Sequence, residues 1–300
     1  MPEKNTTHVF SFLDYLKFQK RYSRHTLISY ETDLRGFWDF MQTDFQVSEP
    51  TDVRSALVRS WLASLKADGQ SAKTINRKIS ALKSYFKHLM RNGVITTTPT
   101  ASIVAPKQSK RLPMFVEVKD TDTLFSHVPF TDDWKGLTTR LILEILYNTG
   151  IRQAELVGLR TDQVDHAQSY IKVLGKGGKE RIIPVSNELL ALINAYEQAK
   201  KDRFEHADTL HLLVKEDGRP LYPKWVYLVV KQYLSLITTI EKRSPHILRH
   251  TFATHLSNAG ADLNAVKELL GHSSLAATQV YTHNTIEKLK DIYQKAHPKA

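Results

Sequence analysis

Residues 244–256 read SPHILRHTFATHL and hold the densest group of reactive side chains in the sequence. Pro245 favours the start of a helix, because a proline at the first helical position gives up no hydrogen bond. His246, Arg249 and His250 then share one face of this helix, since residues three and four positions apart are neighbours on its surface. The segment lacks the glutamate of an HExxH motif and the chain has no cysteine, so we expect no metal site here.

Two segments earlier in the chain add an arginine and a lysine. Residues 149–156 read TGIRQAEL, in which Arg152 follows a glycine helix stop and opens a new helix. Residues 175–179 read GKGGK between two β-rich runs, which predicts a hairpin turn that carries Lys176. This turn is not a phosphate-binding P-loop, because it lacks the GxxxxGK[ST] spacing and joins two strands. Taken singly, the simpler interpretations are a surface arginine paired with Glu155 and an ordinary exposed turn.

Two more candidates follow the SPHILRHTFATHL segment, namely His272 after a glycine and Tyr281 nine residues later. Each alone is explained by a helix cap or by packing, but together the candidates fit chemistry on a phosphodiester. Arginine forks bind the non-bridging oxygens and stabilise added negative charge, and histidines donate hydrogen bonds or move protons. A lysine can protonate the departing oxygen, and a tyrosine can act as nucleophile once cations lower its pKa. The candidate catalytic residues are Arg152, Lys176, His246, Arg249, His272 and Tyr281.

Composition points to a partner with many negative charges. The 300 residues include 42 Lys and Arg against 31 Asp and Glu, a formal net charge of +11, which favours nucleic acid or an anionic membrane surface. Twelve basic residues and a single acidic one, Asp68, lie between Val53 and Arg111, so the charge is concentrated in the first third. The lack of cysteine excludes disulfides, cysteine-ligated metals and a thiol nucleophile. No apolar run approaches the roughly 18 residues of a membrane span, so we expect a cytoplasmic protein without membrane contact.

The first third has helical periodicity throughout. Ser71 opens its clearest helix, which places an apolar stripe on one side and basic residues largely off that stripe. This basic face is interpreted either as a solvated surface or as a DNA contact. The candidate DNA-binding residues on it are Lys73, Arg77, Lys78 and Lys83.

The sequence predicts a mainly α fold in two domains. A helical N-terminal domain spans residues 1–107, and a mixed α/β domain, mostly helical with a small antiparallel sheet, spans residues 115–300. Residues 94–114 are rich in Thr, Ser and Pro and have no periodicity, which suits an exposed stretch between the domains. Within this stretch, the sequence predicts that residues 108–114 form the linker between the two domains.

The pattern TGIR…GKGGKER…HILRHTFATHL…LLGH…Y resembles the tyrosine recombinase (phage-integrase-type) family. Residue type, order and spacing agree, and the resemblance covers essentially the whole chain. The basic helical N-terminal third is similar to the core-binding domain of that family. Chain size and the ending IYQKAHPKA look most like the Xer site-specific recombinases.

The resemblance implies a role for each candidate. Tyr281 would attack the scissile phosphate and form a 3′-phosphotyrosyl linkage, while Arg152 and Arg249 clamp that phosphate. Lys176 would be the general acid for the leaving 5′-hydroxyl, although Lys179 on the same turn competes for this role. Glu155 matches a family position that supports the clamp arginine. His246 and His272 complete the contacts to the pentavalent state, and the family chemistry uses no metal and no cofactor.

The resemblance also implies partners. These are double-stranded DNA with a specific recombination site, a homo- or hetero-tetramer with a paired recombinase, and a DNA translocase as activator. Chromosome-dimer resolution in association with the bacterial nucleoid is the expected role. The apolar stripe of the C-terminal helix, residues 285–296, is expected to dock on a neighbouring subunit, the alternative being its own domain.

Three other functions stay open at the level of sequence. An integrase or transposase of a mobile element would use the same chemistry. A type IB topoisomerase would use similar residues but relax DNA as a monomer. A DNA-binding module without catalytic activity would explain the charge and the basic helix but not the six spaced catalytic candidates.

Overall fold

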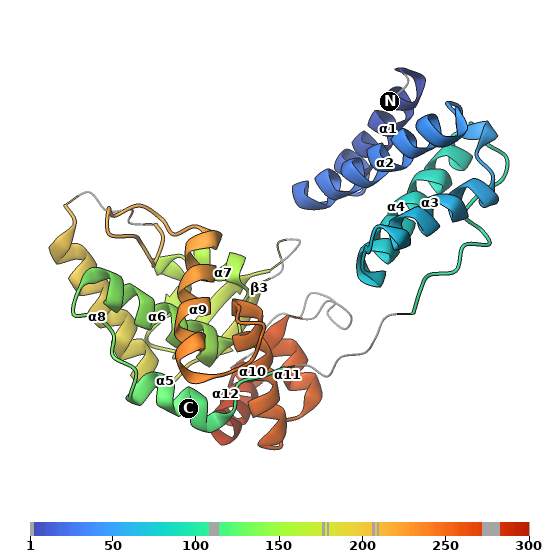
Figure 1. Ribbon diagram of the computed structural model, residues 1–300. Helices are drawn as coiled ribbons and strands as arrows, with labels where there is room; N and C mark the ends of the chain where they lie inside the picture. The colour runs from blue at the N-terminus through green and yellow to red at the C-terminus, as the bar shows by residue number, and fades with distance from the viewer. Residues whose placement is uncertain are drawn as a thin grey trace. The chain divides into compact units, whose positions relative to one another are not determined.

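The computed structural model describes residues 3–107, 114–175, 178, 180–205, 208, 210–271 and 283–299, with only the backbone given for residues 3–6, 283–286 and 288. The chain divides into two compact units, Met1–Arg111 and Leu112–Ala300 (Figure 1). Each unit has its own hydrophobic core, and they are described separately below. No helix in the described ranges is long and apolar enough to cross a membrane.

The first unit is a bundle of helices. Apolar stripes of α1, α2, α3 and α4 face one another, with Phe12, Trp38, Trp61 and Phe86 at their centre. Ser71 caps α4 as the sequence predicts, since its Oγ accepts a hydrogen bond from the Thr74 amide at 3.2 Å. The helices are α1 (Glu3–Asp14), the π-helical turn η1 (Tyr15–Gln19), α2 (Arg24–Phe45), the 3-10 turn η2 (Pro50–Asp52), α3 (Ser55–Ala67) and α4 (Ala72–Arg91).

The segment that follows α4 differs from the sequence-based expectation. Residues 94–106 are not an exposed linker, because Ile103 is buried in the core of the first unit. Asn76 donates a side-chain hydrogen bond to the Pro106 carbonyl at 3.0 Å, and Lys83 donates to the Ile103 carbonyl at 3.1 Å. Residues 94–106 therefore lack helical or strand periodicity because they are irregular, although they pack against the first unit. Residues 108–113 lie outside the described residues.

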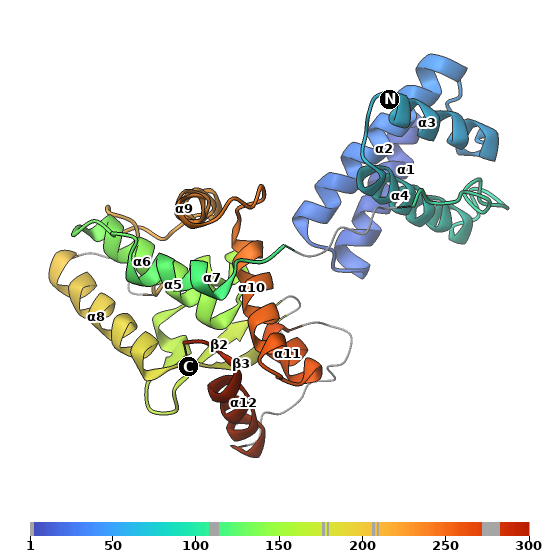
Figure 2. The ribbon, with the colours of Figure 1, turned by 60° about the horizontal axis from the view of Figure 1, so that its bottom comes forward.

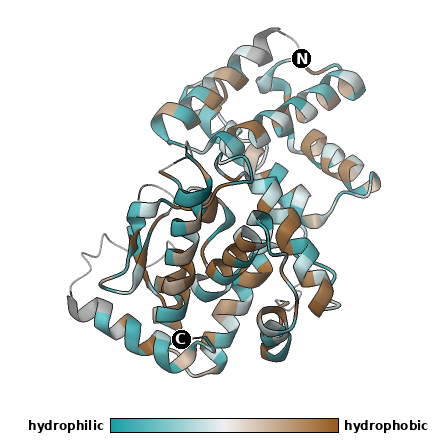
Figure 3. Ribbon diagram, turned by 90° about the vertical axis from the view of Figure 1, so that its left-hand side faces the viewer, coloured by the Kyte–Doolittle hydropathy of each residue, from teal (hydrophilic) through white to brown (hydrophobic). Residues whose placement is uncertain are grey.

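The second unit is built around a buried helix, α6. Nearly every residue of α6 is buried, and α10 and α8 pack against it (Figures 1 and 2). Figure 3 shows apolar residues, in brown, along several helices of the chain. The helices are α5 (Val118–Ser126), α6 (Trp134–Thr149), α7 (Gln153–Val157), the 3-10 turn η3 (Thr161–Gln163), α8 (Asn187–Arg203), α9 (Pro223–Ile237), α10 (Pro245–Asn258), α11 (Leu263–Leu270) and α12 (His283–Ala296).

The second unit also contains a small antiparallel sheet, which confirms the predicted fold class. Its strands β1 (Val164–Asp165), β2 (Tyr170–Leu174) and β3 (Glu180–Pro184) lie in that order. Val173 pairs with Arg181 and Leu174 with Glu180, so the predicted hairpin is present. Helices α11 and α12 lie against β3 (Figure 2).

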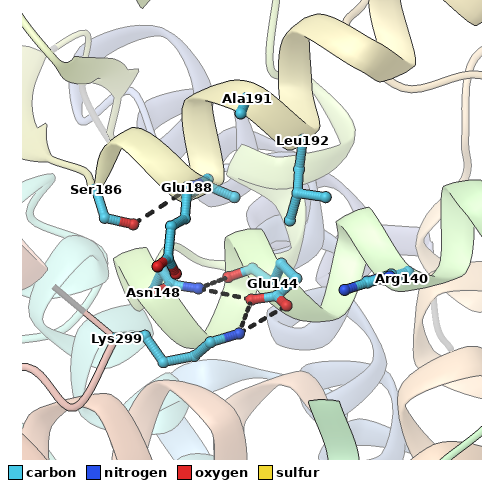
Figure 4. Close-up of a pocket in the computed structure, with 9 residues that line it drawn as sticks. Arg140, Glu144, Asn148, Ser186, Glu188, Ala191, Leu192 and Lys299 are labelled. Carbon is cyan, nitrogen blue, oxygen red and sulfur yellow. Dashed lines mark hydrogen bonds and ion pairs between the residues drawn. The ribbon is translucent and has the colours of Figure 1, made fainter. Parts of the chain in front are cut away.

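In this chain the C-terminal helix α12 packs on its own domain. Leu289 and Tyr293 belong to the core of the second unit. Lys299, beyond the helix, donates to both carboxylate oxygens of the buried Glu144, at 2.7 and 2.6 Å. Figure 4 shows this pair at the edge of a pocket of about 320 Å³ between α6 and α8. The structure of the single chain thus follows the alternative interpretation of the apolar stripe.

Candidate active site

The candidate site begins where α6 ends. Gly150 adopts a left-handed conformation with φ 58°, and a Cβ there would lie 2.5 Å from Cδ1 of Phe252. Only glycine fits this close approach between α6 and α10, as expected for a helix stop. The chain then turns so that Arg152 becomes the N-cap residue of α7.

Arg152 is joined to Glu155 twice. Its Nη1 donates to Oε1 of Glu155 at 2.7 Å, and its backbone amide donates to Oε2 at 2.7 Å. Its Nη2 donates to the Gly271 carbonyl at 3.2 Å. The arginine side chain is 36% exposed, so the simple interpretation, a surface arginine paired with Glu155, is correct for the pairing. The pairing also leaves the guanidinium at the protein surface.

Arg181 on β3 is a site residue that the sequence analysis missed. Its Nη1 and Nη2 donate to Oε1 and Oε2 of Glu155 at 3.0 and 2.8 Å, and its Nε donates to the Leu269 carbonyl at 2.7 Å. Alternation along β3 gives no signal for it, because Ile182 and Ile183, on opposite sides of the strand, are both buried. An inward-facing charge in a strand requires a buried partner.

The carboxylate of Glu155 is held in its ionised form. Burial alone would raise its pKa, but the hydrogen bonds and charge of Arg181, together with the bonds from Arg152, lower that pKa from 4.5 to about 2. Glu155 is therefore negatively charged near neutral pH. It keeps two like-charged guanidinium groups close together.

Arg249 on α10 is the third arginine of the site. It is 8% exposed, and its Nη1 and Nη2 donate to the carbonyls of Gly150 at 2.7 Å and Leu270 at 2.5 Å. Burial and the nearby charges of Arg152 and Arg181 lower its pKa to about 10, which leaves it positive near neutral pH. Three guanidinium groups around a single carboxylate leave an excess of positive charge, which suits an anionic ligand.

His246 lies at the start of α10, one turn before Arg249. It is exposed, and partial burial together with the charges of His250, Arg249 and Arg152 lowers its pKa below 6.5. The imidazole is therefore mainly neutral at pH 7. A neutral imidazole can accept a proton or donate one hydrogen bond to a phosphate oxygen.

The structure thus brings three of the six candidates, Arg152, His246 and Arg249, into one cluster. Lys176, His272 and Tyr281 lie outside the described residues, as does Lys179. The nearest described residues are Gly175, Gly178 and Glu180 around the hairpin turn, Gly271 at the end of α11 and His283 at the start of α12.

The candidate DNA-binding residues of α4 differ in their surroundings. Lys73 is exposed, and Lys83 is exposed but donates to the Ile103 carbonyl. Arg77 and Lys78 both pair with Asp33, which is 1% exposed, and Lys78 itself is only 12% exposed. Sequence alone did not reveal this buried carboxylate, because Asp33 is 44 residues away from Arg77.

The described part of the chain contains no group of three or more His, Asp or Glu side chains arranged to hold a metal ion.

Two solved structures with this fold are recombinases bound to DNA. XerH, a site-specific recombinase bound to palindromic difH substrate, has a TM-score of 0.71 and 22% identity, over 88% of this chain and 78% of that one. The Tn1549 transposon integrase, in complex with transposon right-end DNA, has a TM-score of 0.71 and 20% identity, over 95% and 98% of the two chains. The fold is therefore that of a tyrosine recombinase.

Sequence comparison gives the family. Residues 115–288 match the Phage integrase family, and residues 9–93 match the Phage integrase N-terminal SAM-like domain. Tyrosine recombinase XerC of Listeria innocua is 38% identical over 96% of this chain and 97% of its own length. XerC of Chlorobaculum parvum is 34% identical over 96% and 94%.

The chain belongs to the phage integrase family and is a tyrosine site-specific recombinase with XerC relatives. The resemblance to the Xer recombinases is thereby confirmed, with relatives named XerC.

Proposed function

We propose that this enzyme recombines DNA at a specific chromosomal site together with a paired recombinase, and so resolves chromosome dimers. The observation that carries the chemical part is the cluster of Arg152, Arg181 and Arg249 around Glu155, which provides fixed positive charge for a phosphate. The names of the curated relatives, all XerC among those above, support the Xer role over that of a mobile-element integrase.

The proposed mechanism starts with the scissile phosphate bound by Arg152 and Arg249. Tyr281 reacts as the phenolate, and attack of its Oη on phosphorus breaks the bond to the 5′-oxygen and forms a 3′-phosphotyrosyl linkage. Lys176 gives a proton to the leaving 5′-oxygen. Negative charge builds on the non-bridging oxygens in the transition state, and the two arginines stabilise it.

Strand exchange is the reverse of the cleavage step and uses the same residues. The phosphotyrosyl linkage retains the energy of the broken phosphodiester. A 5′-hydroxyl from the partner duplex attacks phosphorus, returns its proton to the site and releases Tyr281. No nucleotide hydrolysis is required. His246 and His272 would donate hydrogen bonds to the same phosphate oxygens.

The proposed partners are duplex DNA with a specific site, a tetramer formed with a paired recombinase, and a DNA translocase as activator, with the protein at the bacterial nucleoid. The basic α4 supports the DNA partner, with Lys73 and Lys83 as exposed phosphate contacts. Arg77 and Lys78 would contribute from their positions beside Asp33.

The decisive experiment uses a nicked suicide duplex, which traps the covalent complex because the released fragment diffuses away. A pool of genomic fragments in this format identifies both the activity and the site. We expect the wild-type protein to form a covalent adduct, and Tyr281→Phe to bind the same DNA without forming one. Covalent trapping by Tyr281→Phe would contradict the assigned nucleophile, and an adduct without sequence preference would contradict site-specific action.

A further inference from the structure

Arg181 binds a carboxylate inside the protein with both of its terminal nitrogens. Its side chain is 5% exposed, against 36% for Arg152, and it comes from the inward face of β3. Its Nε, Nη1 and Nη2 all have carbonyl or carboxylate acceptors within the protein. Both terminal nitrogens of Arg181 are thus bonded to Glu155, whereas the side chain of Arg152 bonds this carboxylate through Nη1 alone. The terminal nitrogens of Arg249 bond carbonyls.

The carboxylate of Glu155 connects Arg181 to Arg152. Oε1 accepts from Nη1 of both arginines, at 2.7 Å from Arg152 and 3.0 Å from Arg181. Oε2 accepts from the backbone amide of Arg152 at 2.7 Å and from Nη2 of Arg181 at 2.8 Å. Arg181 therefore holds the carboxylate plane from the buried side. Arg152 bonds to the same oxygens from the side that is open to solvent.

Arg181 also contacts the end of α11. Its Nε donates to the Leu269 carbonyl, and its Cδ lies 3.0 Å from the position that a Cβ at Gly271 would occupy. Gly271 has φ 65°, so it lets the helix end approach the guanidinium closely. The same side chain thus joins β3, which follows the hairpin turn, to α7 and α11.

We propose that Arg181 is a positioning residue for the recombination reaction: it orients Arg152 through Glu155 and sets the end of α11 relative to β3. This inference rests on the proposed function, in which Arg152 binds the scissile phosphate. Only arginine can make these three bonds at once, because its planar guanidinium group has several N–H donors in fixed directions. Lysine has a single nitrogen with no fixed plane.

The test measures single-turnover formation of the covalent complex on saturating suicide duplex. The variants are Arg181→Lys and Arg181→Gln, and the control is Arg160→Lys. Arg160 is a matched control because it bonds Asp162 through Nε and Nη2, at 2.9 and 2.7 Å, but is exposed. We expect both Arg181 variants to react about 10- to 100-fold more slowly, with DNA affinity within about threefold of wild type, since small misplacements of a catalytic group have such effects. The control should react at the wild-type rate.

The rate constant and the amplitude separate positioning from a structural role. A variant that only lowers the folded fraction lowers the amplitude of the burst and leaves the rate constant of the folded molecules unchanged. Either Arg181 variant with a rate constant within about twofold of wild type would overturn the inference. A double variant Arg152→Lys/Arg181→Lys should react no more than about twofold more slowly than Arg152→Lys alone, because Arg181 acts through Arg152. Fully multiplicative losses would also overturn it.

The same experiment distinguishes failure of the inference from failure of the proposed function. If Arg152→Lys forms the covalent complex at the wild-type rate, Arg152 does not bind the scissile phosphate. The proposed role of Arg181, which acts through Arg152, is then also refuted. If Arg152→Lys is slow and the Arg181 variants are not, the clamp stands and the role of Arg181 alone is refuted.

Discussion

Replacing Glu155 by glutamine should weaken the second unit by an amount that depends on pH. The pKa of this carboxyl is lowered from 4.5 to about 2, and one pKa unit corresponds to about 1.36 kcal/mol. The ionised form is thus favoured in the fold by about 3 kcal/mol. The Arg152 side of the pair is open to solvent, which screens the charges and reduces the expected contribution to about 2 kcal/mol.

The sign follows from the direction of this pKa change. A carboxyl whose pKa is lower in the folded state stabilises the fold above its unfolded value of 4.5, and this contribution is lost as the pH falls through about 2. Glu155→Gln should therefore lower the melting temperature of the unit by about 4–8 °C at pH 7, at about 2–4 °C per kcal/mol. The difference from wild type should shrink between pH 4.5 and pH 2.

Calorimetric melting of both proteins at steps from pH 7 down to pH 2.5 measures this difference (~0.5-unit steps resolve the titration). Asp162→Asn is the matched control, because Asp162 pairs with Arg160 but is 64% exposed. The control should differ from wild type by no more than about 1 kcal/mol at any pH. The reasoning would be refuted if Glu155→Gln had the same melting temperature as wild type at pH 7. It would also be refuted if the two melting temperatures differed by the same amount at every pH.

Four further outcomes are expected. Arg249→Ala should slow covalent-complex formation by about 100- to 1,000-fold in a single-turnover assay, as loss of a transition-state donor does. Gly150→Ala should destabilise the fold by about 2–4 kcal/mol in urea unfolding, because φ is 58° and the new Cβ would meet Phe252 at 2.5 Å. Lys73→Gln should reduce the slope of log K against log salt by about 1 in DNA titrations, through the loss of one phosphate contact. Burial lowers the pKa of His297 to about 3, so wild-type stability should decline as the pH falls below about 6.5, and His297→Asn should flatten this decline in acid-unfolding curves.

Local patterns in the sequence predicted much of the fold. The apolar stripe of α4, the glycine that ends α6 and the glycine-rich turn between β2 and β3 are each determined by neighbours in the chain. The shared face of His246 and Arg249 on α10 follows from helix geometry alone. These features can be predicted without knowing any tertiary contact.

Features that depend on distant partners were not predicted. Arg181 acquires its role from Glu155, which is 26 residues away, and from Leu269, which is 88 residues away. The basic face of α4, which the sequence leaves open as a solvated surface or a DNA contact, includes Arg77 and Lys78, and the buried Asp33 of α2 pairs with both. Residues 94–106 carry no periodic pattern because carbonyls and isolated side chains, instead of a regular stripe, fix them to α3 and α4.

The end of α11 offers three consecutive carbonyl oxygens, at Leu269, Leu270 and Gly271, and each accepts a hydrogen bond from a different arginine. Two such bonds would leave this helix end free to rotate about the line that joins them. A third bond, from a donor on another element, removes that rotation. The donors lie at the start of α7, on β3 and on α10, so the orientation of the end of α11 is defined relative to three separate parts of the domain at once.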